Sequence, residues 1–263
     1  MAVLMPLGRL IMRRLQHQIV ATSRVVDVPL RSCVHPYCAF RYGEQEYHPY
    51  ETYQVDMHRG MSVRDVRRRF VEFLRHYRPR HWGEALGIRL SQPWPVGGFP
   101  WEERDPGDWR QQGWTRLPDD SPDLLTHFSE AGIPSVRIDE EFMWLERALR
   151  LVSVYGYRPE QYGPAEGMEL RRRDGQAAYL LMDGNHRAGA LVALGYRDTM
   201  VVRCDRVICE DDADEWPLVR LGRIRLSDAL MIFHAFFRGN TSWEPSVTPA
   251  EIIAPVGWKA LYL

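Results

Sequence analysis

The chain has 263 residues, 45% of them hydrophobic, which is enough to bury a sizeable core and excludes a largely disordered protein. The formal net charge is -1 at pH 7, so no overall positive field draws the chain to nucleic acid. Lys259 is the only lysine, so any phosphate binding would use arginine side chains or main-chain amides, and a Walker-type lysine is absent.

Residues 7–19 place leucine and isoleucine at helical spacing, with Arg9, Arg13 and Arg14 between them. This segment lacks the continuous apolar run and the small-residue cleavage site of a signal peptide. The default interpretation is a helix that docks on the body of the protein, and the alternative is one that makes a peripheral contact with a membrane. Four cysteines in a chain of this length suit a reducing compartment. We therefore expect a cytoplasmic protein, with the inner face of the membrane as the surface that residues 7–19 could touch.

A helix is predicted over Ser62–Tyr77, where Ser62 and Asp65 form a capping pair. Between Arg80 and Pro122 the sequence is rich in tryptophan, proline and glycine and has no clear periodicity. Disordered segments are poor in aromatic residues, so we expect an ordered loop that covers a neighbouring surface or forms a lid.

From residue 133 onward the pattern predicts the order strand, helix, hairpin, helix, strand. The predicted elements are a strand over 135–138, a helix capped by Asp139 and closed by Gly156, a hairpin of 167–173 and 176–182 turned at Asp174-Gly175, a helix after Gly184, and a strand over 199–204. A final helix is predicted from Ser227, as N-cap, to Arg238, with Gly239 as its stop. Together these elements define an α+β fold.

The run DGNHRAGALVALGY, residues 183–196, joins the hairpin to the following helix. Gly184 would let the backbone approach a ligand, and the N–H groups of Asn185, His186 and Arg187 would point out of the first helical turn. Such a helix start attracts phosphate, which Arg187 and His186 could also bind through their side chains. The alternative is an ordinary turn in which His186 and Arg187 pair with an acid such as Asp183.

This run, with the elements before it, resembles the ParB/sulfiredoxin superfamily, whose members carry a Gly-x-(His/Arg)-Arg box between a strand and a helix. The resemblance covers about Pro134 to Arg206. It implies a nucleotide-binding core in which Gly184, Asn185, His186 and Arg187 cradle the phosphates, with ATP as the expected nucleotide and ADP or CTP as alternatives. Asn185 stands where sulfiredoxins have cysteine, and no helix-turn-helix follows the box. Both departures argue against a sulfinic-acid reductase and against DNA partition.

The kinase-like members of the superfamily carry an acid near the start of the first helix, which here would be Glu140 or Glu141. Either glutamate could take a proton from an acceptor hydroxyl, although acids are favoured in a first turn without any catalytic role. Asp183 could hold Mg²⁺ between phosphate oxygens, or simply cap the turn.

Other residues could also bind metal. His35 and His48 lie in two His-Pro-Tyr strings, and the four cysteines form two pairs with x4 spacing, but nothing in the sequence fixes their geometry. A metal site is the less favoured interpretation for both sets.

The resulting expectation has three parts: an N-terminal helical and irregular region (1–130), a ParB/sulfiredoxin-like core (131–210) and a C-terminal helical extension packed on the core (211–263). The expected function is a nucleotide-dependent phosphotransferase acting on a hydroxyl of a small molecule. A weak resemblance after residue 215 to proteins of bacterial surface-polysaccharide contexts favours a sugar. The alternatives are a nucleotide-sensing or protein-interaction module without catalysis and, disfavoured by the charge, a nucleic-acid binder or nuclease.

Overall fold

The structure is a computed structural model of residues 1–263 and describes residues 23–36, 39–43, 49–76, 81–94, 98–102, 135–196 and 199–239. The described strands are β1 (Arg24–Val28), β2 (Cys33–Val34), β3 (Ala165–Arg171), β4 (Ala177–Asp183) and β5 (Met200–Cys209). The described helices are α2 (Pro49–His58), α3 (Val63–His76), α4 (Trp82–Leu86), α6 (Ser135–Tyr155), α7 (Pro159–Tyr162), α8 (Asn185–Ala193), α9 (Pro217–Arg220), α10 (Leu226–Arg238) and the short 3-10 helices η1 (Leu30–Ser32) and η4 (Glu210–Glu215).

The five strands form one mixed, open sheet in the order β1-β5-β3-β4-β2, so the α+β class is confirmed. β3 pairs antiparallel with β4 and parallel with β5. β1 pairs antiparallel with β5 at one edge, and β2 pairs parallel with β4 at the other. Both edge strands therefore come from residues 24–34, outside the predicted core of 131–210.

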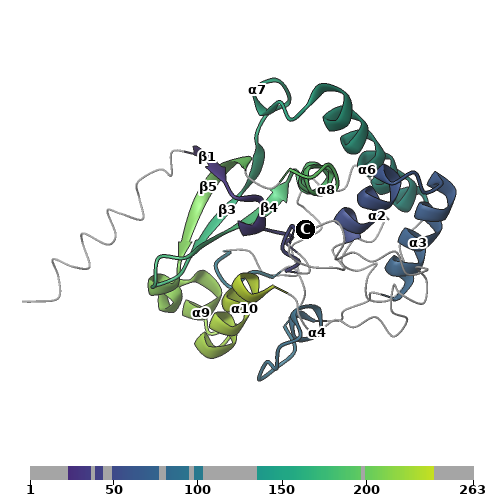
Figure 1. The fold of residues 1–263 in the computed structure, drawn as a ribbon. Coiled ribbons are helices and arrows are strands. Elements are labelled where there is room, and N and C mark those ends of the chain that lie inside the picture. Colours follow the sequence, from purple (N-terminus) through teal and green to yellow (C-terminus); the bar gives the residue numbers. More distant parts are fainter. Residues whose placement is uncertain are drawn as a thin grey trace, which may run out of the picture.

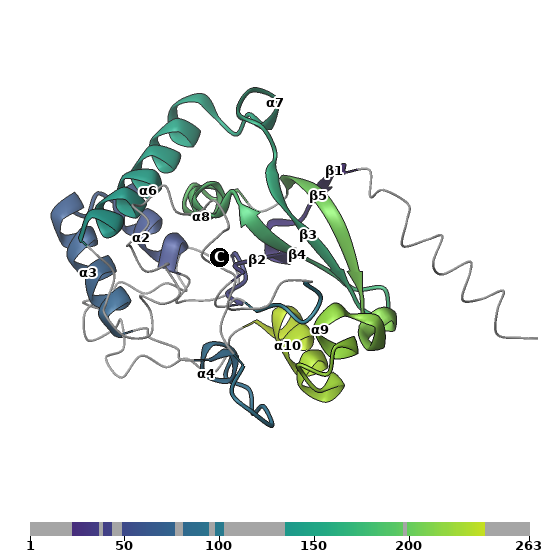
Figure 2. The ribbon, with the colours of Figure 1, turned by 180° about the vertical axis from the view of Figure 1, so that it is seen from behind.

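Apolar clusters cover both faces of the sheet, and the two faces differ in which helices they pack against (Figures 1 and 2). On one face lie α8 and the second half of α6, and the cluster there includes Leu149, Leu181, Leu191 and Val202. Adjacent strand residues point to opposite faces, so Leu180 belongs to the other cluster. Strands buried on both faces explain why the sequence of β4, AAYLLMD, shows little polar alternation.

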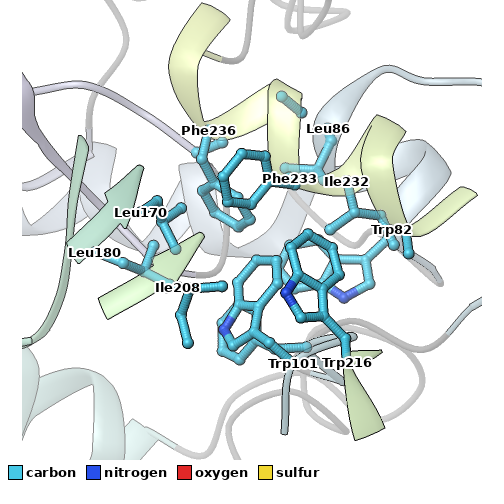
Figure 3. Packing of buried hydrophobic residues seen from close by; sticks show 14 of the residues in the cluster. Trp82, Leu86, Trp101, Leu170, Leu180, Ile208, Trp216, Ile232, Phe233 and Phe236 are labelled. Atoms are coloured by element: carbon cyan, nitrogen blue, oxygen red, sulfur yellow. The ribbon is translucent and has the colours of Figure 1, made fainter. Parts of the chain in front are cut away.

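The opposite face of the sheet carries an aromatic cluster (Figure 3). It joins strand residues to α10 and to the tryptophan-rich segment between residues 80 and 102. Trp101 is stacked on Phe99, with ring centroids 5.3 Å apart, and meets Phe233 of α10 edge-on at 5.9 Å. The described part of the tryptophan-rich segment is therefore ordered and covers a neighbouring surface, as predicted, but it is not a loop throughout, because Trp82–Leu86 form α4.

Several predicted elements are confirmed. Helix α3 matches the predicted Ser62–Tyr77 helix within a residue at its end, and the Ser62 hydroxyl accepts the Asp65 N–H at 3.2 Å. The hairpin turns at Gly175, whose φ of +87° is in the left-handed region. Gly239 ends α10 as predicted, but that helix begins at Leu226, so Ser227 is inside it and is not the N-cap.

The predicted strand over 135–138 is wrong, because those residues form the first turn of α6. Asp139 is consequently inside the helix and is not an N-cap. Its carboxylate accepts hydrogen bonds from the Arg67 guanidinium, the Nε donor lying at 2.9 Å, so it joins α6 to α3.

No helix in the described part of the chain is long and apolar enough to cross a membrane. Residues 7–19, for which a membrane or docking contact was predicted, lie outside the described residues, as do His48 and Cys38.

Candidate functional site

The candidate site is the amino end of α8, which follows directly from β4. Asp183 ends the strand, and Gly184 is the N-cap with φ +91° and without a side-chain capping bond. A Cβ on Gly184 would lie 2.7 Å from the Cβ of Ala165 in β3. The glycine is thus required by the turn and by its packing against β3. This is a different reason from the predicted close approach of a ligand, since the missing side chain would point into the protein.

Asn185 is buried, and its side chain binds the protein itself. The Tyr42 hydroxyl donates to Oδ1 at 2.8 Å, and Nδ2 donates to the Leu181 carbonyl at 3.0 Å. Asn185 can therefore offer a ligand only its main-chain N–H, which as part of the first helical turn lacks an acceptor within the helix.

His186 and Glu141 form a pair between α8 and α6. His186 Nε2 lies 2.8 Å from Glu141 Oε2. The side chain of Glu141 is 10% exposed and that of His186 is 26% exposed, so the imidazole is the more accessible partner. Of the two predicted glutamates, Glu141 is the one that the structure brings to His186, while Glu140 is partly exposed on the same helix.

His35 is a third titratable group beside this pair, in the turn after β2. It is buried, and its main-chain N–H donates to the Phe40 carbonyl at 2.9 Å. Burial lowers the pKa of His35 to about 3; Glu141 acts against this shift and His186 adds to it. His35 is accordingly neutral at physiological pH, and the pair has an uncharged neighbour.

Arg187 is bound to its own chain. Its guanidinium donates to the carbonyls of Gly163 at 2.5 Å and Pro164 at 3.2 Å, and to Asp183 Oδ2 at 3.2 Å. The pairing of Arg187 with Asp183 is the ordinary-turn arrangement that the sequence offered as an alternative. Arg187 thereby holds the segment before β3, and replacing it would disturb that segment as well as any bound ligand.

Asp183 is the exposed carboxylate of the site, with 68% of its side chain accessible. Carboxylate oxygen is the ligand type that Mg²⁺ prefers, together with phosphate oxygens and water. Among the described residues no group of three or more His, Cys, Asp or Glu side chains is arranged to hold a metal ion. A metal at this site would therefore depend on Asp183 and on the ligand.

Sequence reasoning missed α2, which supplies buried polar groups behind the site. Residues 51–56 are all buried, including Glu51, Thr52, Gln54 and Asp56. Gln54 Nε2 donates to the carbonyl of Leu145 at 2.9 Å and to that of His186 at 3.0 Å. A polar run such as ETYQVD predicts an exposed helix, so its pattern gave no signal for this role.

Comparison of the chain with models of known protein families, with curated proteins and with solved structures found no match. The chemistry of the site must therefore be inferred from its geometry. It combines a helix start with glycine as its N-cap, the exposed carboxylate of Asp183 just before it, and a carboxylate–imidazole pair whose glutamate comes from α6.

Proposed function

We propose that the protein is a nucleotide-dependent phosphotransferase whose site is the amino end of α8. The observation that carries this proposal is the 2.8 Å contact between Glu141 and His186 at a helix start whose N-cap residue, Gly184, offers no side-chain cap. An uncapped helix start favours phosphate, and a carboxylate–imidazole pair is suited to moving a proton.

In this proposal the nucleotide phosphates bind the main-chain N–H groups of the first turn, next to the His186 ring. Asp183 would hold Mg²⁺, which neutralises phosphate charge when bound. ATP is the expected nucleotide. The side chain of Arg187, which holds Gly163 and Pro164, would contribute through the shape of the loop and less as a direct phosphate ligand.

The burial of the pair favours His186 as the proton acceptor, with Glu141 orienting it. An acceptor hydroxyl oxygen forms the new bond to the terminal phosphorus, and the bond from that phosphorus to the leaving nucleotide breaks. The hydroxyl proton passes to the His186 imidazole, whose Nε2 lies against Glu141. Glu141 accepts the hydrogen bond from Nε2 and stabilises the resulting imidazolium.

The resemblance to the ParB/sulfiredoxin superfamily belongs to the same proposal. It is supported by the order of hairpin, box, helix and strand, which the structure has as β3, β4, α8 and β5. A small-molecule or sugar hydroxyl is the acceptor class that the resemblance favours, and a cytoplasmic location goes with it.

A second candidate function is a nucleotide sensor without phosphoryl transfer. It is favoured by the commitment of the Asn185 and Arg187 side chains to the chain itself. In a sensor, ligand binding would compete with these bonds and change the packing around α8.

The test is a thermal-shift panel of ATP, ADP, CTP and GTP with Mg²⁺, followed by ³¹P NMR with a panel of sugar and amino-acid hydroxyl acceptors. Glu141→Gln keeps a hydrogen-bond acceptor but loses the charge, so we expect the nucleotide shift to remain and kcat to fall by about 10² to 10⁴. The matched control is Glu140→Gln on the same helix, which should behave as wild type.

The outcomes separate the candidates. Transfer that is lost in Glu141→Gln and kept in Glu140→Gln supports the phosphotransferase. A thermal shift without any new phosphate ester supports the sensor. A folded protein that shifts with none of the four nucleotides would overturn both.

A further inference from the structure

Gln54 connects the two helices that carry the Glu141–His186 pair. Its amide nitrogen donates both hydrogens, one to the Leu145 carbonyl of α6 and one to the His186 carbonyl of α8. Leu145 lies one turn beyond Glu141 on α6, and His186 is the other member of the pair. One side chain on α2 is therefore hydrogen-bonded both to the backbone of His186 and to the turn of α6 that begins at Glu141.

Packing alone does not explain a glutamine at this position. Gln54 is 0% exposed, and among the described residues its Oε1 has no hydrogen-bond partner. A buried carbonyl oxygen without a donor is unfavourable, and an apolar side chain of similar shape would avoid that penalty. What the glutamine adds is the pair of hydrogen bonds made by Nε2.

The contact between Glu141 and His186 is sensitive to the position of their helices. The apolar cluster shared by α6 and α8, which includes Leu149 and Leu191, is held by a non-directional effect that does not itself fix a hydrogen-bond distance. A hydrogen bond of 2.8 Å does not tolerate a displacement of about 1 Å.

We propose that Gln54 is a positioning residue that holds Glu141 and His186 in hydrogen-bonding register by binding the Leu145 and His186 carbonyls. The catalytic consequence rests on the proposed function, but the effect on the geometry of the pair does not. Gln54 thus belongs to the site although it touches neither the substrate nor the reacting atoms.

The first readout is the ring ¹⁵N and ¹H resonances of His186 in the full chain, assigned with His186→Gln. Glu141→Ala provides the spectrum of the broken pair. We expect Gln54→Met, which keeps the shape and removes both donors, to shift the His186 resonances to the positions seen in Glu141→Ala.

The matched control is Tyr53→Phe, the neighbouring position on α2. It removes a buried hydrogen bond to the Arg69 carbonyl of α3, at 3.2 Å, and leaves the contacts to α6 and α8 in place. The His186 resonances should keep their wild-type positions in this variant. A shift equal to that of Gln54→Met would overturn the proposal, because the loss of any buried hydrogen bond on α2 would then be enough to move the His186 resonances.

If Gln54→Met does not fold, Gln54→Asn tests the positioning role in its place, because the shorter amide cannot reach both the Leu145 and the His186 carbonyl. Unchanged His186 resonances in either folded variant overturn the positioning role. Where transfer is detected, Gln54→Met should lower kcat on the order of 10²-fold, the effect of a displacement of about 1 Å, with KM for the nucleotide unchanged. If wild type transfers no phosphate, the phosphotransferase fails, while the resonances still decide the role of Gln54.

Discussion

Gly184 is required for two reasons, its backbone conformation and its packing, and a Cβ at this position would be unfavourable for both. Its φ of +91° is unfavourable for other residues, and a Cβ would lie 2.7 Å from that of Ala165. We expect Gly184→Ala to lower the free energy of unfolding by about 2 to 4 kcal/mol, the sum of left-handed strain and overpacking. Urea denaturation of the variant, followed by circular dichroism, measures this change.

The hairpin offers the control for Gly184. Gly175 has nearly the same φ, +87°, but a Cβ there would have no atom of the described residues within 4 Å. Gly175→Ala should therefore cost only the strain, about 1 kcal/mol. Equal losses in the two variants would mean that β3 yields to the added methyl group and that only the backbone requires glycine at position 184.

The buried imidazole of His35, beside the Glu141–His186 pair, makes the stability of the protein depend on pH. Its native pKa of about 3 lies below the ordinary value of 6.5, because burial disfavours the charged imidazole. Between these two values the unfolded chain binds a proton that the native protein does not bind, so stability falls as the pH falls. The contribution is roughly 1 kcal/mol per pH unit from pH 6.5 downward and is absent above that pH.

Other groups also titrate in this range, so the measurement is a difference between two proteins. Urea denaturation of wild type and His35→Gln at pH 4.5, 5.5, 6.5 and 7.5 gives two curves of stability against pH. We expect the variant to have the shallower slope below pH 6.5 and the same slope as wild type above it. Parallel curves over the whole range would mean that His35 takes up its proton in the native state.

At the scale of single elements, the sequence predicted those whose signals are local. The Ser62–Asp65 cap, the Asp174-Gly175 turn and the Gly239 stop each fix a boundary through contacts within a few residues. Such contacts form in nearly the same way whatever the rest of the chain does. The boundaries of α3, the hairpin and the end of α10 could therefore be predicted well.

The first turn of α6 shows where local signals fail. The segment SVRI alternates and contains two β-branched residues, and Asp139 after it has the composition of an N-cap. Four residues are too few to distinguish the hydrophobic period of a helix from that of a strand. The helix is instead stabilised further along, by the burial of Phe142, Leu145 and Leu149, and it extends back through the ambiguous segment.

The site was predicted only in part for a related reason. The box of residues 183–187 is contiguous in sequence, and the resemblance pointed to Glu140 or Glu141 without distinguishing them. Gln54 and Tyr42 contact that box from more than 130 residues away, with no spacing rule that connects them to it. Contacts of this kind follow from the packing of α2 against α6 and α8, which the sequence does not display.

At the scale of the whole molecule, the sheet depends on segments outside the predicted core. β1 and β2 supply its edges, and the aromatic cluster that covers Leu170, Leu180 and Ile208 takes its members from residues 82–101 and from α10. Within the described residues, the sheet and both of its cover layers are therefore made from all three predicted parts of the chain.

This arrangement predicts that residues 131–210 do not fold alone. Such a fragment would expose the apolar face of β3, β4 and β5 that Trp82, Trp101 and Phe233 cover in the full chain. Each Å² of apolar surface left exposed lowers the free energy of unfolding by about 25 cal/mol, and a small domain is too marginally stable to remain folded after such a loss. We expect poorly dispersed ¹H–¹⁵N spectra and no cooperative thermal transition for the fragment. A fragment of residues 23–239, which keeps every described element, should melt in a single transition. A dispersed spectrum with cooperative melting for residues 131–210 would instead make the central segment an independent domain, with β1, β2 and the aromatic layer as additions to it.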